Sequence, residues 1–161
     1  MTDRIFVTVG AQMHFDRLVG AVDMWSASTT RKVEVFAQVG PSEAPPANVE
    51  WTRSLGPHEF ADRMRWADVV VSHAGMGTIL SCLVEGVPLV LMPRRGDLME
   101  TRNDHQVGTI ARFADWAGVT SAPDEDAVVA TLESGDWSRP DAISPHASTE
   151  LIATIRDFID A

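Results

Sequence analysis

The length, composition and charge of this chain exclude several classes of protein. Its 161 residues make room for one ordinary domain with a core, and 45% hydrophobic with 22% charged residues is typical of a globular chain. The lone cysteine, Cys82, excludes a disulfide framework and a multi-cysteine zinc site. No apolar run is long enough to span a bilayer and no secretory signal is visible, so we expect a cytoplasmic protein.

The formal charge of −10 is unevenly distributed. Residues 1–114 carry 13 acidic and 11 basic side chains, whereas residues 115–161 carry 10 acidic and 2 basic ones. An acidic C-terminal third argues against nucleic acid as a partner. It leaves a local anion site open, because the arginines cluster elsewhere.

Short apolar runs alternate with segments of helical periodicity along the chain. Strands are expected at residues 4–9, 32–39, 49–52, 69–71, 87–92 and 118–121. Helices are expected at residues 15–27, after Pro57, from Ile79 to Gly86, and at residues 103–115, 124–132 and 149–160. This order predicts an α/β fold, a parallel sheet with helices on both faces, in one domain over residues 1–161. Ligands of such sheets bind beyond the carboxyl ends of the strands, so the loops after Val9, Val71 and Met92 are the candidates for a site.

The segment from Ser72 to Thr78 is the strongest candidate for an anion site. Gly75 and Gly77 let a ligand approach the backbone closely, and the amides that open the next helix favour a phosphate or a diphosphate. Thr78 adds a hydroxyl and His73 a ring donor. The alternative is a tight strand-to-helix turn in which glycine serves packing only. The segment is neither a Walker loop nor a G-x-G-x-x-G fingerprint.

A polar segment follows the next strand. Arg94 and Arg95 suit a diphosphate or a carboxylate, and the run Asn103-Asp104-His105-Gln106 suits sugar hydroxyls. A solvated loop with an N-capped helix explains the same residues.

The remaining candidates are weaker. The first loop, with Gly10 and Ala11, is a turn that most parallel sheets contain, and its neighbour His14 is a weak candidate for a catalytic base. The histidines lack metal-ligand spacing, so we expect no metal. Leu151, Ile152, Ile155, Phe158 and Ile159 form an apolar stripe on the last helix, which covers either the sheet of this domain or a partner.

Three strings of residues resemble the C-terminal domain of glycosyltransferase family 28. They are WADVVVSHAGMGTIL at residues 66–80, GVPLVLMPRR at residues 86–95 and RNDHQ at residues 102–106. The opening residues 5–10 and 15–18 fit as well, so the resemblance covers roughly residues 4–120. The chain is most similar to the short subunit of two-component enzymes, and within them to the bacterial exopolysaccharide branch.

The resemblance implies one Rossmann-like half of a GT-B enzyme, the C-terminal-type half that holds a UDP-sugar and needs no cofactor. The acceptor half would be a membrane-anchored partner subunit that recruits this chain to the inner face of the cell membrane. The acceptor would be a glycan on a polyprenyl diphosphate, and the catalytic base is expected on the partner.

The resemblance also implies roles for single residues. The diphosphate would contact Gly10, Ala11, His73, Gly75, Met76, Gly77, Thr78 and Arg94. The uracil and ribose would contact Leu55, Gly56, Pro57, Ser81 and Glu85. The sugar would contact Arg95, Asn103, Asp104, His105 and Gln106.

Two departures from the family pattern bear on these roles. Ser81 stands where many relatives have an acid for the ribose, and Ala11 where relatives often have Thr. Arg94 and Arg95 fit a glucuronate donor, the diphosphate or the partner chain equally well. A regulatory or scaffold subunit that binds nucleotide without catalysis is the second hypothesis. An epimerase-like enzyme needs two such halves, for which the chain is too short.

Overall fold

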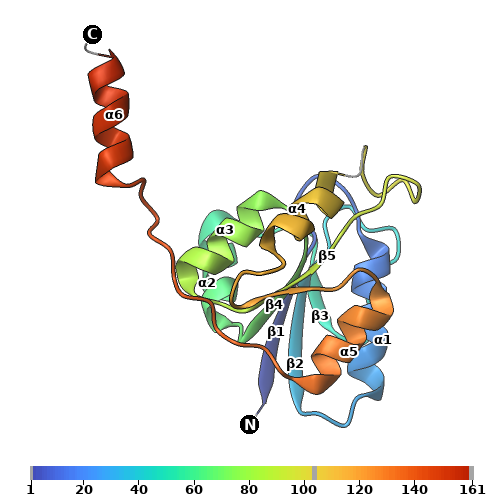
Figure 1. Cartoon of the computed structure of the whole chain (residues 1–161). Helices are drawn as coiled ribbons and strands as arrows, with labels where there is room; N and C mark the ends of the chain where they lie inside the picture. Colours follow the sequence, from blue (N-terminus) through green and yellow to red (C-terminus); the bar gives the residue numbers. More distant parts are fainter. Residues whose placement is uncertain (1, 103–104, 160–161) are drawn as a thin grey trace.

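A computed structural model describes residues 2–102 and 105–159, and within them one sheet is surrounded by helices (Figure 1). The strands are β1 (Asp3–Thr8), β2 (Val33–Gln38), β3 (Glu50–Thr52), β4 (Val69–His73), β5 (Leu89–Met92) and β6 (Val119–Ser121). The helices are α1 (Asp16–Ser28), α2 (Pro57–Trp66), α3 (Met76–Glu85), α4 (His105–Phe113), α5 (Glu125–Ser134) and α6 (Thr149–Ile159). The expected alternation of strands and helices is confirmed.

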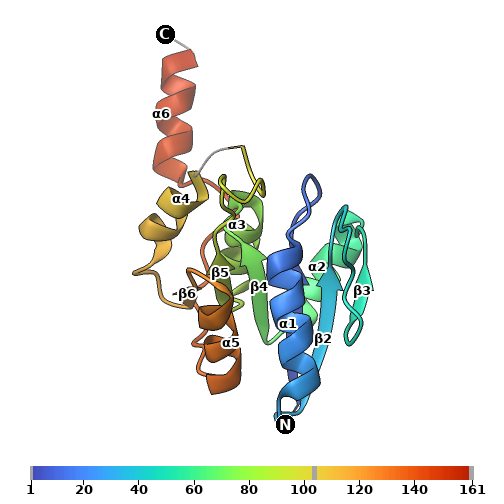
Figure 2. The same cartoon turned by 90° about the vertical axis from the view of Figure 1, so that its right-hand side faces the viewer.

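The sheet is parallel throughout, with the strand order β3-β2-β1-β4-β5-β6 (Figure 2). The order reverses direction between β1 and β4, and Thr8 pairs with Ser72 there, while His73 pairs with Met92 on β5. The chain therefore leaves β1, β4 and β5 at neighbouring points. In doubly wound sheets this switch point is where ligands bind.

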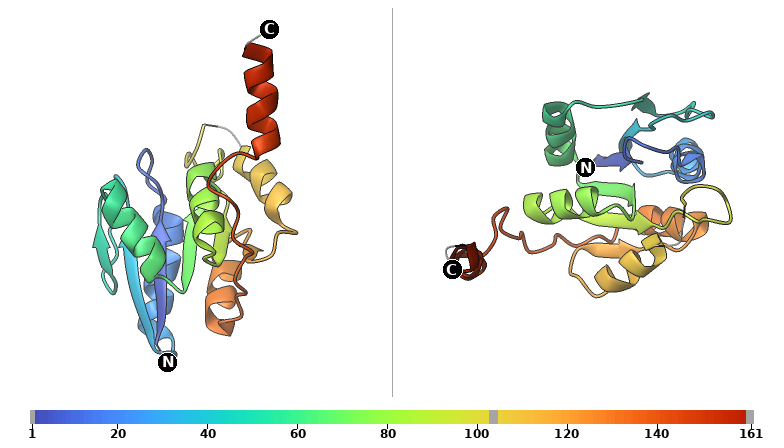
Figure 3. Two further views of the ribbon diagram at one scale, coloured as in Figure 1. Left: turned by 90° about the vertical axis from the view of Figure 1, so that its left-hand side faces the viewer. Right: turned by 90° about the horizontal axis from the view of Figure 1, so that it is seen from above.

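Helices cover both faces of the sheet, as predicted (Figure 3). Val69 and Val71 of β4 pack with α1 and α5 on one face, and Val70 between them packs with α2 and α3 on the other. Because each central strand is buried on both sides, its sequence is a continuous apolar run and does not alternate with polar residues.

Two helix ends follow from local sequence. The carboxylate of Asp124 accepts a hydrogen bond from the Ala127 amide at 2.9 Å and caps α5, as the acidic run at residues 124–126 predicts. Gly86 ends α3 with φ +65°, a left-handed conformation that glycine adopts without strain.

Helix α6 projects away from the rest of the chain (Figure 1). None of its described residues is buried, and Phe158 is 84% exposed. The stripe therefore does not cover the sheet of its own domain, which was one of the two expectations. The segment before it is attached to the body, because the Ile143 amide donates to the Leu83 carbonyl of α3 at 3.1 Å. No helix in the described part of the chain is long and apolar enough to cross a membrane.

Burial predicts that truncating one apolar side chain in α5 lowers stability strongly, whereas truncating one in α6 changes it little. Leu132 of α5 is fully buried, so Leu132→Ala should lower the free energy of unfolding by about 2–5 kcal/mol. Ile155 of α6 is half exposed and has no core contact, so Ile155→Ala should change it by less than about 0.5 kcal/mol. Urea denaturation of the two variants measures both values, and an equal loss of stability would show that α6 packs on the domain.

Candidate functional site

A cavity of about 440 Å³ lies at the carboxyl ends of β1, β4 and β5, within the size range of small-molecule sites. The loops after these three strands and the start of α4 form its walls. Nine residues that the sequence predicts for donor binding line it: Gly10, Ala11, His73, Gly75, Gly77, Thr78, Arg94, His105 and Gln106. The site predicted from three separate segments is therefore brought together in space.

The N-terminus of α3 opens into this cavity. Gly75 caps the helix without a side chain, and the first turn contains no acidic residue. The amides of Met76, Gly77 and Thr78 have no hydrogen-bond acceptor among the described residues. The Thr78 hydroxyl is likewise unpaired within that part of the chain. Unpaired amides at a helix start carry partial positive charge, so this end of α3 is suited to an anion.

His73, the last residue of β4, lies between the glycines of two loops. A Cβ on Gly10 would stand 3.0 Å from its Cε1 atom, and a Cβ on Gly75 would overlap its Nε2 atom. Gly10 also has φ +74°, so a side chain there would be strained as well as crowded. The imidazole ring therefore requires glycine at both positions, whether or not a ligand requires it as well.

The guanidinium of Arg94 is buried behind the cavity. Its Nη1 donates to the carbonyls of His14 at 2.7 Å and Glu100 at 3.0 Å, and its Nη2 to those of Val9 at 2.6 Å and Met13 at 2.8 Å. Burial lowers the pKa of Arg94 to about 10, which leaves it charged at neutral pH.

This geometry changes the role predicted for Arg94. Both of its Nη atoms hold the first loop and its own loop in place, so they are not free to bind a diphosphate directly. Arg94 therefore holds two of the loops that line the cavity and places a positive charge beside it. No carboxylate in the described chain is hydrogen-bonded to it.

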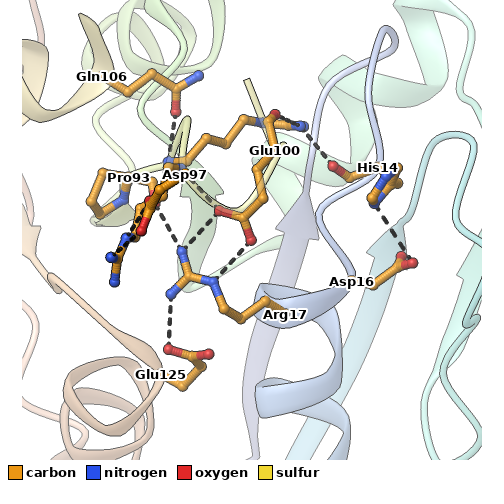
Figure 4. Close-up of polar contacts among 10 residues, drawn as sticks. His14, Asp16, Arg17, Pro93, Asp97, Glu100, Gln106 and Glu125 are labelled. Carbon is orange, nitrogen blue, oxygen red and sulfur yellow. Dashed lines mark hydrogen bonds and ion pairs between the residues drawn. The ribbon is translucent and has the colours of Figure 1, made fainter. Parts of the chain in front are cut away.

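A second arginine, Arg17, binds the carboxylate of Glu100 in the loop after β5 (Figure 4). Arg17 of α1 donates to both carboxylate oxygens of Glu100, at 2.9 Å and 3.0 Å, and to Glu125 of α5 at 2.8 Å. The Arg95 amide donates to Glu100 as well, at 2.9 Å. These bonds raise the pKa of Arg17 and tie the loop after β5 to α1 and α5.

A second cavity, of about 510 Å³, lies between α2 and α3. Leu55, Pro57, Ser81 and Glu85 line it, four of the five residues predicted for uracil and ribose. The fifth, Gly56, caps α2, and its amide donates to the Glu59 carboxylate at 2.9 Å. Since α3 borders both cavities, a ligand lying along its first two turns would reach from one to the other.

Several predicted residues are not among those that line the first cavity. Met76 is 46% exposed at the start of α3. Arg95 pairs with Asp97 at 2.6 Å and borders a different cavity beside α4, so the structure does not support its predicted contact with the sugar. The His14 ring lies near Asp16, with 3.7 Å between Nδ1 and Oδ2, so the candidate base is outside the cavity.

Two of the residues predicted to contact the sugar line the first cavity. Asn103 and Asp104 lie outside the described residues. Gln106 is buried, and its Oε1 accepts from the Arg94 amide at 3.1 Å, so it both lines the cavity and fixes the loop after β5. His105 lines the cavity beside it.

Sequence reasoning missed the residues that hold the loops. Gln12, which belongs to the first loop beside Gly10 and Ala11, also lines the first cavity, whereas Met13 and Thr101 in its lining were missed. Arg17 and Glu100 were also missed. They are hydrogen-bonded although 83 residues separate them in the sequence, and no local sequence pattern predicts such a pair. In the described part of the chain, no group of three histidine, cysteine or acidic side chains is placed to hold a metal ion.

Two adjacent arginines are expected to differ sharply in their effect on stability. Arg94→Met leaves four backbone carbonyls without this donor, so the free energy of unfolding should fall by about 2–4 kcal/mol. Arg95→Met removes an exposed ion pair and should leave it almost unchanged. Thermal and urea unfolding compare the two, and equal effects would contradict the structural role of Arg94.

Solved structures with the same fold are glycosyltransferases. MurG from Acinetobacter baumannii matches with a TM-score of 0.58 and 18% identity, over 81% of this chain and 40% of that chain. The NMR structure of ALG13 matches with a TM-score of 0.55 and 17% identity, over 95% and 94%. SsfS6 from Streptomyces sp. SF2575, complexed with thymidine diphosphate, matches with a TM-score of 0.51 and 24% identity, over 82% and 32%.

These likenesses show a shared fold, and the family is shown by the sequence. A search of curated proteins gave no match. The chain spans about a third of the length of the first structures that it matches. The sequence profile of the glycosyltransferase family 28 C-terminal domain matches residues 4–133, as the motifs predict. The chain is a C-terminal-type half of the GT-B fold, and it belongs to the glycosyltransferase family 28 C-terminal domain family.

Proposed function

We propose that this chain is the donor-binding subunit of an inverting glycosyltransferase. It moves a sugar from a UDP-sugar to a polyprenyl-diphosphate-linked glycan in exopolysaccharide synthesis, together with a membrane-anchored acceptor subunit. The observation that carries the proposal is the first cavity, where three unpaired amides of α3 and the Arg94 cation meet. Buried positive charge without a carboxylate on it is suited to a nucleotide diphosphate.

The second cavity supports a nucleoside beside the diphosphate. Its apolar lining, which includes Leu55 and Phe60, can cover a base, while Ser81 and Glu85 supply polar groups for the ribose. The nucleotide would then lie along α3, with its diphosphate at the start of the helix. The neighbour SsfS6 is complexed with thymidine diphosphate, which supports a pyrimidine nucleotide of this kind.

In the proposed reaction the leaving group is UDP. Negative charge develops on its diphosphate as the bond to the sugar breaks, and the α3 amides, the helix dipole and Arg94 would stabilise it. An acceptor hydroxyl must lose a proton to a general base. His14 lies outside the cavity, which favours a base on the partner subunit.

The proposed partner subunit would supply the acceptor half of the GT-B cleft. The chain spans 40% of MurG, so a second half would complete the GT-B cleft. The exposed stripe on α6 is available to such a partner, which would recruit this chain to the inner face of the cell membrane. Arg95 lies away from the first cavity, so it does not favour glucuronate as the donor sugar.

The α3 N-terminus offers a variant that should affect the ligand without disturbing the protein. A Cβ on Gly77 meets no atom within 4 Å, so Gly77→Ala should fold normally. If the diphosphate lies against this turn, the variant should weaken the binding of UDP and UDP-glucose at least about tenfold. Isothermal titration calorimetry measures both affinities.

Gly20→Ala, in α1 and equally open, is the matched control and should bind as the unaltered chain does. UDP-glucuronate and dTDP are titrated beside UDP-glucose to rank donors. If none of these nucleotides binds, alone or with the partner, the donor-subunit proposal is wrong. Binding without sugar transfer by the reconstituted pair would support a regulatory or scaffold subunit instead.

The α6 stripe predicts where the partner binds. Ile155→Glu places a charge on the apolar face, so it should reduce co-purification with the proposed acceptor subunit at least about tenfold. Ala153→Glu adds the same charge on the opposite face of the helix and should have little effect. Equal recovery of the partner with both variants would show that α6 does not bind it.

A further inference from the structure

The His73 ring is held in one orientation by the end of β1. The Ser72 hydroxyl donates to the Thr8 carbonyl at 2.8 Å, so its oxygen presents a lone pair to His73 Nδ1 at 3.3 Å. The nitrogen that faces an acceptor carries the hydrogen. The neutral ring therefore has its hydrogen on Nδ1 and its lone pair on Nε2.

Nε2 lies beside Gly75, at the end of α3 that would receive the diphosphate. Burial opposes protonation of the ring most strongly, and the positive charge of Arg94 adds to this effect. With a smaller contribution from His105 of α4, and against the opposing effect of the Thr8 carbonyl, they lower the pKa of His73 to about 4. No carboxylate of the described chain contributes to this shift.

The site thus combines amides that attract an anion with a lone pair that repels one. A phosphate oxygen brought close to Nε2 would face another acceptor, unless Nε2 first gains a hydrogen. A bound dianion also reverses the field of Arg94 at the ring, which raises the pKa of a nearby histidine.

We propose that His73 is neutral in the free protein and takes up one proton at Nε2 when the diphosphate of a nucleotide-sugar binds. The proton comes from the buffer, and the resulting imidazolium donates to a phosphate oxygen. This inference rests on the proposed function, and it makes His73 a ligand whose charge depends on the donor.

The sign of the pH dependence follows from this linkage. Between the pKa values of the free and the bound states, each binding event takes up a proton, so affinity falls as pH rises, by up to about tenfold per pH unit. Above the pKa of the bound state the affinity is weak and independent of pH.

The test is calorimetry with UDP-glucose at about pH 6 in buffers of different ionisation enthalpy. The diphosphate diester of UDP-glucose does not titrate near neutral pH, so the protons counted belong to the protein. We expect uptake close to one proton per molecule bound. In His73→Gln, whose amide donates without protonation, we expect binding with no uptake and no pH dependence.

His146→Gln is the matched control, because His146 is an exposed histidine that does not line the cavity, and it should keep the uptake. The ¹⁵N signals of the His73 ring in the unaltered chain give an independent measurement, with Nε2 changing from unprotonated to protonated on binding. Binding with an unchanged Nε2 signal and no uptake would overturn the inference and leave the donor site standing. Uptake that persists in His73→Gln would overturn it too, whereas a lack of all binding would overturn both proposals.

Discussion

The candidate site depends on the buried guanidinium of Arg94. Three of its four carbonyl partners, on Val9, Met13 and His14, belong to the first loop, and the fourth is on Glu100 of its own loop. Each of these bonds joins a full charge to a carbonyl dipole, which offsets the loss of hydration on burial. Two of the loops that line the first cavity are thereby tied to one guanidinium.

The same arrangement explains how a chain of charge −10 can present a positive cavity. Glu100 is the acidic residue whose charge acts on Arg94, but its carboxylate oxygens are hydrogen-bonded to Arg17 and to the Arg95 amide instead. Charge on a buried group acts over short distances with little screening, whereas exposed acids elsewhere on the surface are screened by salt. The positions of the nearby charged groups therefore determine the sign of the electrostatic field at the start of α3, and the net charge of the chain does not.

Most of the fold was predictable from sequence because local patterns determine it. Apolar runs such as residues 69–71 mark strands buried on both faces, and residues 75–78 were placed at the site because a small-residue loop follows the strongest of them. The directions of Arg94 and Arg95 were not predictable. They are adjacent arginines, and only Arg94 is buried, because its guanidinium donates to carbonyls of the first loop, which is distant in the sequence. The position of α6 was equally open, since an apolar stripe is the same whether its own sheet or another chain covers it.

Helix α3 connects the first cavity with the segment that leads to α6. Its first turn presents amides to the cavity that have no partner in the described chain. In its last turn, the Leu83 carbonyl accepts the Ile143 amide. Ile143 lies five residues before Ser148, the serine that caps α6. Ten residues of α-helix form a rod about 15 Å long, too short and too well packed to bend. The segment that leads to α6 is therefore attached at one end of this rod, and the first cavity lies at the other end.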